Sequence, residues 1–484
     1  MNEVSLSRVI AYWADRDPDA PAISHDDVTV TRAELERRTN RLARAFEQLG
    51  VGQDDFVTVA LPNCLAFLES IIAIWKLGAT PLPVSYRLPE LERRQIIEIG
   101  KPTLVIGADP GSHGDTVCVP AGFEPDAALS DAPLPERTAR HWKVLTSGGS
   151  TGRPKLIVSE EPATADLDEE KLGFVPNLTN LVPGPLYHNG PFIFALLGLR
   201  KGHHVIITSR FDAAETLRLI DEYAVEMMYL VPTMMQRMLA LPEQERARHD
   251  VSSLKVVWHM AAPCPPWVKE AMIDWFGAEV LFELYGGTEA QGYTVITGTE
   301  WLTRKGSVGK PIDGCEMKVV DDDGKELPRG EIGEIYMLPE GGQGSTYHYV
   351  GAEVRDMAGG WESLGDMGYM DEEGYLFLTD RRTDMILSGG ANIYPAEVEA
   401  AIDSCPGVRS SAVIGLPDRD MGNLVHAVVD APAGDVTEER LLAHLADSLV
   451  RYKIPRTIEF VTEPVRDDAG KTRRTALRAA RMQA

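Results

Sequence analysis

Apolar residues recur at helical spacing in the segment TRAELERRTNRLARAFEQLG, which begins at Thr31. Leu35, Leu42 and Phe46 fall on one side of a helix of about 3.6 residues per turn, and most of the other positions are polar or charged. Thr31 and Glu34 have the spacing of a capping box, in which each residue satisfies a backbone amide at the start of a helix. The pattern therefore predicts a surface helix with one buried stripe.

Shorter apolar runs have the length of buried strands. DFVTVAL (residues 55–61), HHVIIT (203–208) and EMMYLVP (226–232) are runs of this kind. They alternate with helical stretches for much of the chain. This alternation predicts an α/β fold with layered sheets.

The pattern changes beyond about residue 300, where short β segments are separated by Gly, Asp and Pro. Such segments predict hairpins and a β subdomain. An α+β pattern resumes later, with a helix beginning after Pro395 and a strand at SSAVIGL, and a charged junction near Thr383 separates the two parts. We therefore expect a large N-terminal domain (1–383) of layered α/β sheets plus a β subdomain, and a small mobile α+β domain (384–484).

Composition narrows the choice of partners. The 484 residues are 44% hydrophobic and carry a formal net charge of -25, which allows a substantial core and disfavours attraction to nucleic acid or to an anionic membrane. Residues 451–484 are an exception, with nine basic and four acidic residues. This tail is either a site for a polyanion or a solubilising helix face, and charge alone does not decide between them.

The cysteines and the N-terminus indicate a compartment. Five cysteines are widely spaced, with no Cys-x-x-Cys pair and no histidine arranged beside them as a metal ligand. They predict free thiols in a reducing environment. The first twenty residues include acidic side chains and lack a long apolar run, so we expect a cytoplasmic protein without a signal peptide or membrane anchor.

The segment TSGGSTGRPK (residues 146–155) combines glycines, hydroxyl side chains and a terminal Lys155. A Walker loop has Gly directly before Lys and Ser or Thr directly after it, whereas here Pro154 precedes the lysine and Leu156 follows it. A P-loop NTPase is therefore disfavoured. The glycines still allow backbone amides to converge on an anion. Taken alone, the segment is equally consistent with a phosphate-binding loop and with a flexible turn between strands.

Three later motifs carry groups that suit a nucleotide. ELYGGTEAQG places Tyr285, Thr288 and Glu289 on one turn, where a ring, a hydroxyl and a carboxylate suit a purine, a phosphate and a divalent cation. Asp366 follows a glycine and suits two adjacent sugar hydroxyls, and Lys471 follows a glycine in the basic tail. Each of these motifs alone is more often a simple turn.

Together and in this order, the motifs resemble those of the adenylate-forming acyl-CoA synthetases, relatives of luciferases and nonribosomal adenylation domains. The resemblance covers nearly the whole chain and includes the segments PLYHNG, GSVGKP, GLPD and YKIP. HMAAPCPPWVKE and GGSTGRPK look most like bile-acid, aryl and alicyclic acid CoA ligases. The resemblance implies that a carboxylic acid reacts with ATP and Mg²⁺ to give an acyl-adenylate and pyrophosphate, and that CoA then displaces AMP to form a thioester.

The resemblance also implies a role for each matched residue. ATP or AMP is assigned to Ser150, Thr151, Gly152, Lys155, Ala261, Ala262, Tyr285, Thr288, Glu289, Asp366 and Arg381, with Glu289 also ligating Mg²⁺. The catalytic assignment comprises Lys471, which would reduce the repulsion between carboxylate and phosphate, and His188, for which a buried structural histidine is the alternative. CoA is assigned to Gly389, Gly390 and Lys453, and the hinge to Thr383.

The acyl pocket is assigned by proximity to the motifs alone, to Phe192, Ile193, Trp258, His259 and Gly286. The expected partners are the carboxylic acid, ATP and CoA, with no nucleic acid. A homodimer is an assembly that the sequence allows.

Several positions depart from the usual family pattern. Gly148 stands where a serine is usual, and Met260 and Ala261 replace two glycines of the adenine loop. Three hypotheses follow. The chain is a complete ATP-dependent acyl-CoA ligase for a bulky apolar acid, an enzyme that only forms the thioester from a supplied acyl-adenylate, or a non-catalytic nucleotide or CoA sensor.

Overall fold

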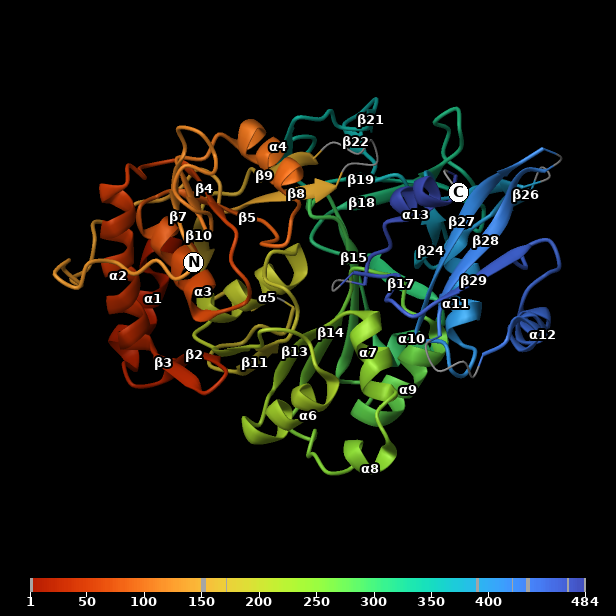
Figure 1. The fold of residues 1–484 in the computed structure, drawn as a ribbon, viewed down its shortest axis with the longest axis horizontal. Coiled ribbons are helices and arrows are strands. Elements are labelled where there is room, and N and C mark those ends of the chain that lie inside the picture. The colour runs from red at the N-terminus through yellow and green to blue at the C-terminus, as the bar shows by residue number, and fades with distance from the viewer. Residues whose placement is uncertain are drawn as a thin grey trace.

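The computed structural model describes residues 3–148, 154–170, 172–388, 391–419, 421–431, 436–467 and 470–482. Figure 1 shows the N-terminal elements on the left, a sheet through the middle and the C-terminal elements on the right. The helices are α1 (Leu6–Arg16), α2 (Arg32–Gln48), α3 (Leu65–Lys76), α4 (Glu90–Gly100), α5 (Asn189–Arg200), α6 (Ala213–Glu222), α7 (Pro232–Leu239), α8 (Glu243–Arg246), α9 (Pro266–Phe276), α10 (Gly298–Thr303), α11 (Pro395–Asp403), α12 (Glu438–Ser448) and α13 (Arg474–Met482).

Within the described residues, fifteen strands form one continuous sheet. In spatial order they are β21 (Asp356–Met357), β22 (Trp361–Glu362), β19 (Gly333–Leu338), β23 (Asp366–Met370), β24 (Leu376–Arg381), β17 (Ser307–Pro311), β16 (Tyr293–Thr297), β15 (Leu281–Gly286), β14 (Val256–His259), β13 (Met227–Leu230), β11 (Thr179–Val182), β12 (His204–Ile207), β2 (Pro21–His25) and β3 (Val28–Thr31), with β18 (Glu316–Val320) beside β19. Neighbouring strands from β2 to β15 are parallel, and those from β15 to β21 are antiparallel.

The β segments between residues 307 and 381, apart from Tyr347–Val350, therefore belong to the antiparallel half of this sheet. They are joined to the parallel half through the pairing of β16 with β17 and of β17 with β24. They also have a separate apolar core, which includes Val308, Ile335 and Met337. The sequence predicted the short strands, but not that they extend the large sheet, because strand pairing depends on contacts between distant segments.

Smaller sheets complete the fold. A parallel sheet contains β5 (Thr80–Pro83), β4 (Phe56–Val59), β6 (Leu104–Ile106) and β7 (Val117–Val119), and an antiparallel one contains β20 (Tyr347–Val350), β9 (Pro154–Ser159) and β8 (Val144–Gly148). The C-terminal elements form β25 (Ile386–Ser388) with β26 (Ala391–Ile393), and β27 (Ser410–Asp418) with β28 (Gly422–Asp430) and β29 (Thr457–Val461). A short pair joins β1 (Glu3–Ser5) to β10 (Thr164–Asp166).

The helix predicted from Thr31 is α2, and the structure confirms its capping box. The Thr31 hydroxyl accepts from the Glu34 amide, and the Glu34 carboxylate accepts from the Thr31 amide. Leu35 and Phe46 are fully buried, so the predicted stripe faces the core. The helix predicted after Pro395 is α11, and the predicted strand SSAVIGL lies in β27.

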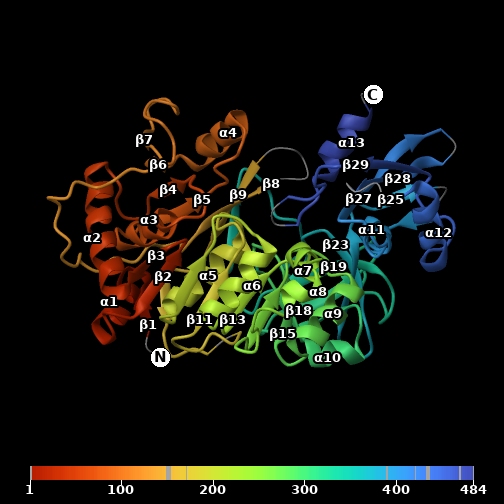
Figure 2. The same ribbon diagram turned by 60° about the horizontal axis from the view of Figure 1, so that its bottom comes forward.

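The C-terminal elements have a core of their own. Its buried members all lie between Ile386 and Leu449. Figure 2 shows these elements gathered on one side of the large body. This separation supports a domain boundary near residue 383, which we retain as a proposal.

Candidate functional site

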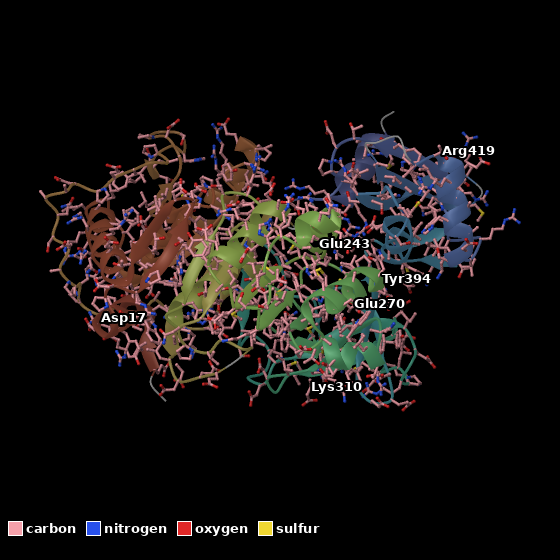
Figure 3. The ribbon with its side chains drawn as sticks, turned by 90° about the horizontal axis from the view of Figure 1, so that it is seen from below. Asp17, Glu243, Glu270, Lys310, Tyr394 and Arg419 are labelled. Atoms are coloured by element: carbon pink, nitrogen blue, oxygen red, sulfur yellow. The ribbon has the colours of Figure 1, made fainter. Side chains whose placement is uncertain are left out.

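A cleft of about 2850 Å³ lies between the large body and the C-terminal elements. Figure 3 labels Tyr394, a cleft residue beside the C-terminal ribbon. The predicted site residues that line the cleft are Lys155, His188, Ile193, Ala261, Ala262, Tyr285, Gly286, Thr288, Glu289, Asp366, Thr383, Lys453 and Lys471. One cavity therefore brings together residues predicted for nucleotide binding, catalysis and the hinge.

The other predicted residues fall into two groups. Phe192, Trp258 and His259 are buried and do not belong to the described lining of the cleft, so any effect they have on a ligand acts through the residues that they support. The positions Ser150, Thr151, Gly152, Gly389 and Gly390 and the side chain of Arg381 lie outside the described residues.

The candidate phosphate loop connects two antiparallel strands. β8 and β9 pair with Gly148 opposite Pro154 and with Ser147 opposite Lys155. A Walker loop instead leads directly into a helix. The rejection of a Walker loop from the sequence thus agrees with the hairpin topology, in which Lys155 lies on the second strand.

Glu289 is a buried carboxylate at the cleft wall with two neighbours from other strands. The Tyr349 hydroxyl donates to Glu289 Oε1 at 2.6 Å, and Lys155 Nζ lies 3.7 Å from the same oxygen. The ammonium also lies 3.6 Å from the centre of the Tyr349 ring. Burial and the nearby carboxylate raise the pKa of Tyr349, so its hydroxyl remains a donor at neutral pH.

This carboxylate has the chemistry that Mg²⁺ prefers, although the protein provides only part of a coordination shell. In the ranges that the structure describes, no three His, Cys, Asp or Glu side chains gather as metal ligands. Mg²⁺ commonly binds through one or two carboxylates together with substrate phosphates and water. Glu289 beside Lys155 therefore suits a Mg²⁺ ion that arrives with a polyphosphate.

Sequence reasoning missed Tyr349. The alternation in YHYV indicates a strand, and β20 is that strand, paired with β9. Tyr349 and Glu289 are 60 positions apart, and no spacing in the sequence connects them. Only the tertiary fold reveals that this hydroxyl orients the carboxylate.

Tyr285 and Asp366 meet at the end of β15. The Tyr285 hydroxyl donates to Asp366 Oδ2 at 2.8 Å. In the pairing of β23 with β24, Asp366 lies opposite Arg381. The fold thus aligns the three residues that the sequence assigned to the adenosine part of a nucleotide.

The glycines that follow Tyr285 lie in closely packed surroundings. A Cβ atom at Gly286 would lie 2.4 Å from Cδ1 of Tyr293, and one at Gly287 would lie 2.7 Å from Cδ1 of Leu364. These distances are far below a van der Waals contact. Glycine is therefore required at position 286, where the Gly292 carbonyl is also within 2.9 Å, whereas a side chain at position 287 would require the Leu364 side chain to move.

Ala261 has the left-handed backbone conformation, with φ +78°. It follows β14 in the loop that carries the predicted adenine contacts. The sequence departure noted above thus places a Cβ atom where glycine would be unstrained.

Replacing this alanine gives a direct test of the strain. Ala261→Gly is expected to raise the free energy of unfolding by about 0.5–1 kcal/mol, because relief of the strain exceeds the added entropy of the unfolded chain. Ala262, whose φ is not positive, provides the control: Ala262→Gly should lower stability by a similar amount. Urea unfolding measures both, and equal effects of the two glycines would contradict the strain.

α5 begins directly after His188 and carries one wall of the cleft. His188 is the N-cap residue of this helix, and its ring lies 4.6 Å from that of Tyr187. Lys143 is buried behind this point and donates from Nζ to Asn189 Oδ1 at 2.5 Å. Burial lowers the pKa of Lys143 to about 7. The bond ties the first residue of α5 to the buried Lys143.

Three aromatic residues surround the middle of this wall. The ring of Phe194 lies 5.3 Å from that of Phe174 and 5.1 Å from that of Tyr229, and all three residues line the cleft. Trp258 packs behind them, 6.3 Å from Phe194, and donates from Nε1 to the Leu172 carbonyl. His259 is fully buried, and burial holds its pKa well below the ordinary value. It is a neutral side chain of the supporting core.

Lys471 is presented by a turn from the C-terminal domain. The Lys471 amide donates to Asp467 Oδ1 at 2.9 Å, and the Gly470 amide donates to the Asp467 carbonyl at 2.8 Å. A Cβ at Gly470 would lie 3.2 Å from Thr233 Oγ1. The turn therefore packs against α7 of the large domain and places Lys471 in the cleft.

Buried ion pairs hold both sides of this turn. Arg474 Nη2 donates to both oxygens of Glu399 at 2.8 Å, and Arg466 Nη2 donates to Glu399 Oε2 at 3.1 Å. Arg466 also approaches Asp403, whose pKa is raised to about 6 by burial. Several basic residues of the tail are thus paired within the protein, which neither of the two interpretations of its charge foresaw.

The chain around Thr383 is anchored on both sides, to different parts of the fold. Before it, Arg382 Nη1 donates to Glu334 Oε2 at 3.0 Å in the large sheet. After it, Asp384 Oδ2 accepts from Arg474 at 2.7 Å in the C-terminal domain. Thr383 is the residue between these two anchors, which is the place that a hinge requires.

Lys453, which was assigned to CoA, and the five cysteines also have defined surroundings. Lys453 forms an ion pair of 2.6 Å with Glu397 on α11. The five cysteines are free thiols. Among the helices of the described segments, none combines the length and the apolar character needed to cross a bilayer.

Comparison with known proteins gives consistent matches along the chain. Residues 10–343 match the family described as AMP-binding enzyme, and residues 397–471 match the AMP-binding enzyme C-terminal domain. A feruloyl-CoA synthase from an Amycolatopsis species is 34% identical, with 94% of each chain covered. A Rhodococcus jostii CoA ligase named for a dioxo-octahydroindenyl propanoyl group is 29% identical, covering 94% of this chain and 95% of its own. The crystal structure of ATP-bound MatB from Rhodopseudomonas palustris superposes with a TM-score of 0.82 at 26% identity and 99% coverage of both chains.

Proposed function

This chain belongs to the AMP-binding enzyme family and is an AMP-forming acid–thiol ligase, and from that premise we propose that it activates bulky apolar carboxylic acids through an acyl-adenylate. The proposed overall reaction consumes the acid, ATP and CoA and yields the acyl-CoA thioester, AMP and pyrophosphate. Enzymes of this class use ATP. The carboxylate of Glu289 and the ammonium of Lys155 at the cleft support that use, because they suit Mg²⁺ and a polyphosphate.

The nucleotide is proposed to bind along the ends of β15 and β23. Tyr285 offers a ring for adenine, and Asp366 offers a carboxylate for the ribose hydroxyls. Thr288, which lines the cleft, would donate to the α-phosphate, and Lys155 would neutralise the terminal phosphates. Glu289 would hold Mg²⁺, which supplies positive charge to the triphosphate when bound.

Lys471 is proposed to stabilise the transition state of adenylation. The attacking carboxylate and the α-phosphate are both anionic, so their approach is opposed by repulsion. An ammonium held in the cleft offsets this repulsion at the reacting atoms. Its turn packs on the large domain, and this placement supports the role.

The acyl group is proposed to lie along α5. Ile193, Phe194 and Leu197 line the cleft on this helix, and Phe174 and Tyr229 face them from other elements. This broad aromatic and aliphatic wall is the observation that carries the preference for a bulky apolar acid, since burial of apolar surface favours binding in proportion to the area removed from water.

The second half of the reaction is proposed to follow a rotation of the C-terminal domain at Thr383. Thioester formation needs the acyl-adenylate to meet the thiol of CoA, while Lys471 is required only before that. We retain Gly389, Gly390 and Lys453 as the residues that would contact CoA.

The test is pyrophosphate release that depends on the acid. With ATP, Mg²⁺ and a panel of aryl, alicyclic and fatty acids, bulky apolar acids should give the highest kcat/KM, and adding CoA should convert the adenylate to the thioester. Short acids such as acetate serve as the control. Equal turnover of short and bulky acids would reject the substrate class. Pyrophosphate release absent throughout the panel, with a supplied acyl-adenylate still converted, would reject the adenylation step.

A further inference from the structure

The cleft continues along one face of α5 to the far end of that helix. The lining residues on this helix are Asn189, Gly190, Pro191, Ile193, Phe194, Leu197 and Arg200, and from Gly190 to Arg200 they are linked by spacings of three and four positions along one face. The residues between them, such as Phe192, Ala195 and Leu199, are buried on the other side. A helix rises about 1.5 Å per residue, so this wall extends roughly 17 Å from its start beside His188.

The wall is apolar for most of this length and ends at a positive charge. Trp142 and Leu172 join the aromatic residues described above, and Arg200 closes the row. The guanidinium carbon of Arg200 lies 4.6 Å from the centre of the Trp142 ring and 6.0 Å from that of Trp75. The side chain thus lies close to two indoles at the end of the acyl wall.

Arg200 has hydrogen-bond donors without an acceptor. Its Nε is buried and unpaired, and across the described ranges none of its three nitrogens forms a hydrogen bond or an ion pair. The neighbouring Lys201 differs, because its Nζ donates to the carbonyls of Asp166, Leu167 and Glu169. Burial lowers the pKa of Arg200 to about 10, so the group remains charged at neutral pH. The charged guanidinium of Arg200 therefore lies beside the cleft with donors that a ligand can use.

We propose that Arg200 binds a neutral oxygen at the remote end of the acyl group, so that the preferred acids are apolar in the middle and carry a distant ketone, ether or hydroxyl oxygen. This rests on the proposed function, since it assumes that the acyl group lies along α5. A second carboxylate is disfavoured because Glu161 and Glu169 line the same part of the cleft and already act on the charge of Arg200.

The experiment compares acids that differ only at the remote end: decanoic acid, its oxo analogue with a terminal methyl ketone, and decanedioic acid. The measured quantity is kcat/KM for pyrophosphate release. Wild-type enzyme is expected to favour the oxo acid over decanoic acid by roughly tenfold, the size of one net hydrogen bond to a charged group. Longer and shorter oxo acids should lose this advantage, because the oxygen then misses the guanidinium.

Arg200→Met keeps much of the packing stem and removes the donors, so it should reduce the tenfold preference to about one while decanoic acid is still used. Arg200→Lys should keep part of the preference. Arg218→Met makes the same change on an exposed face of α6 and should leave the preference intact. A preference that survives in Arg200→Met, or a wild-type ratio near one, would overturn the proposal and leave Arg200 as a structural residue.

The outcome is separable from that of the proposed function. Failure of every acid to release pyrophosphate rejects the proposed function, and thermal-shift titration with the same acids then decides the inference about Arg200. Greater stabilisation by the oxo acid in wild type than in Arg200→Met supports it, and equal stabilisation overturns it. If Arg200→Met does not fold, Arg200→Lys and the chain-length series provide the same decision.

Discussion

Lys471→Ala is expected to slow acid-dependent pyrophosphate release by at least about a hundredfold, because removing one preoriented positive donor from a charge-bearing transition state typically costs this much. The KM for the acid should change far less, since the acyl wall along α5 lies on the large domain. The turn at Asp467 and Gly470 presents Lys471 at the cleft.

The same variant should retain the second half of the reaction. A synthetic acyl-adenylate plus CoA should give thioester at a rate within a few fold of wild type, because the repulsion that Lys471 offsets has already been overcome. Lys325→Ala, on an exposed turn of the large domain, is the matched control and should leave both rates unchanged. Loss of both half-reactions in Lys471→Ala, or loss of neither, would contradict the assigned role.

Short motifs in the sequence were enough to select residues that line the cleft. Tyr285 lies at the end of β15, and Thr288 and Glu289 lie on the turn that follows, so their proximity follows from local order. The glycine at position 286 is explained by the closeness of Tyr293 and of the Gly292 carbonyl. The capping box of α2 was predictable for the same reason, since its bonds join residues three apart.

Residues that act across the fold were not predictable in this way. Tyr349 reaches Glu289 because β20 lies beside β9. Arg200 lines the end of the cleft because the cleft runs along the whole length of α5. Neither relation has a fixed spacing in the chain. Trp258 and His259 were assigned to the acyl pocket only because they are near a motif. Their strand β14 ends near the cleft, but their side chains pack into the core.

The partners of the charged residues in the C-terminal tail were also not predictable from the sequence. Nine basic residues suggested a polyanion site or a solvated helix face. In the structure, Arg466 and Arg474 pair instead with Glu399, which is 3% exposed. Composition gives the number of charges but not their partners, so this network appears only once Arg466 and the start of α13 are packed against α11.

Glu399→Gln is expected to destabilise the C-terminal domain by about 3 kcal/mol. The carboxylate accepts from Arg466, from Arg474 and from the Val413 amide, so its neutralisation leaves two buried guanidinium groups without their shared anion. Breaking a buried pair by removing one charge typically costs 3–5 kcal/mol. Hydrogen exchange at the Val413 amide reports the change locally and should accelerate by about two orders of magnitude.

The consequence for catalysis follows from the position of these pairs. Arg466 precedes the Lys471 turn and Arg474 follows it, so weaker anchoring should let the turn leave the cleft and lower kcat for adenylation by roughly tenfold, with the KM for ATP little changed. Glu463→Gln, an exposed site in the same domain, should alter stability by less than about 0.5 kcal/mol. If Glu399→Gln kept its Val413 protection and its adenylation rate, the buried network would have no part in positioning Lys471, and the turn would have to be held by Asp467 and its contact with Thr233 alone.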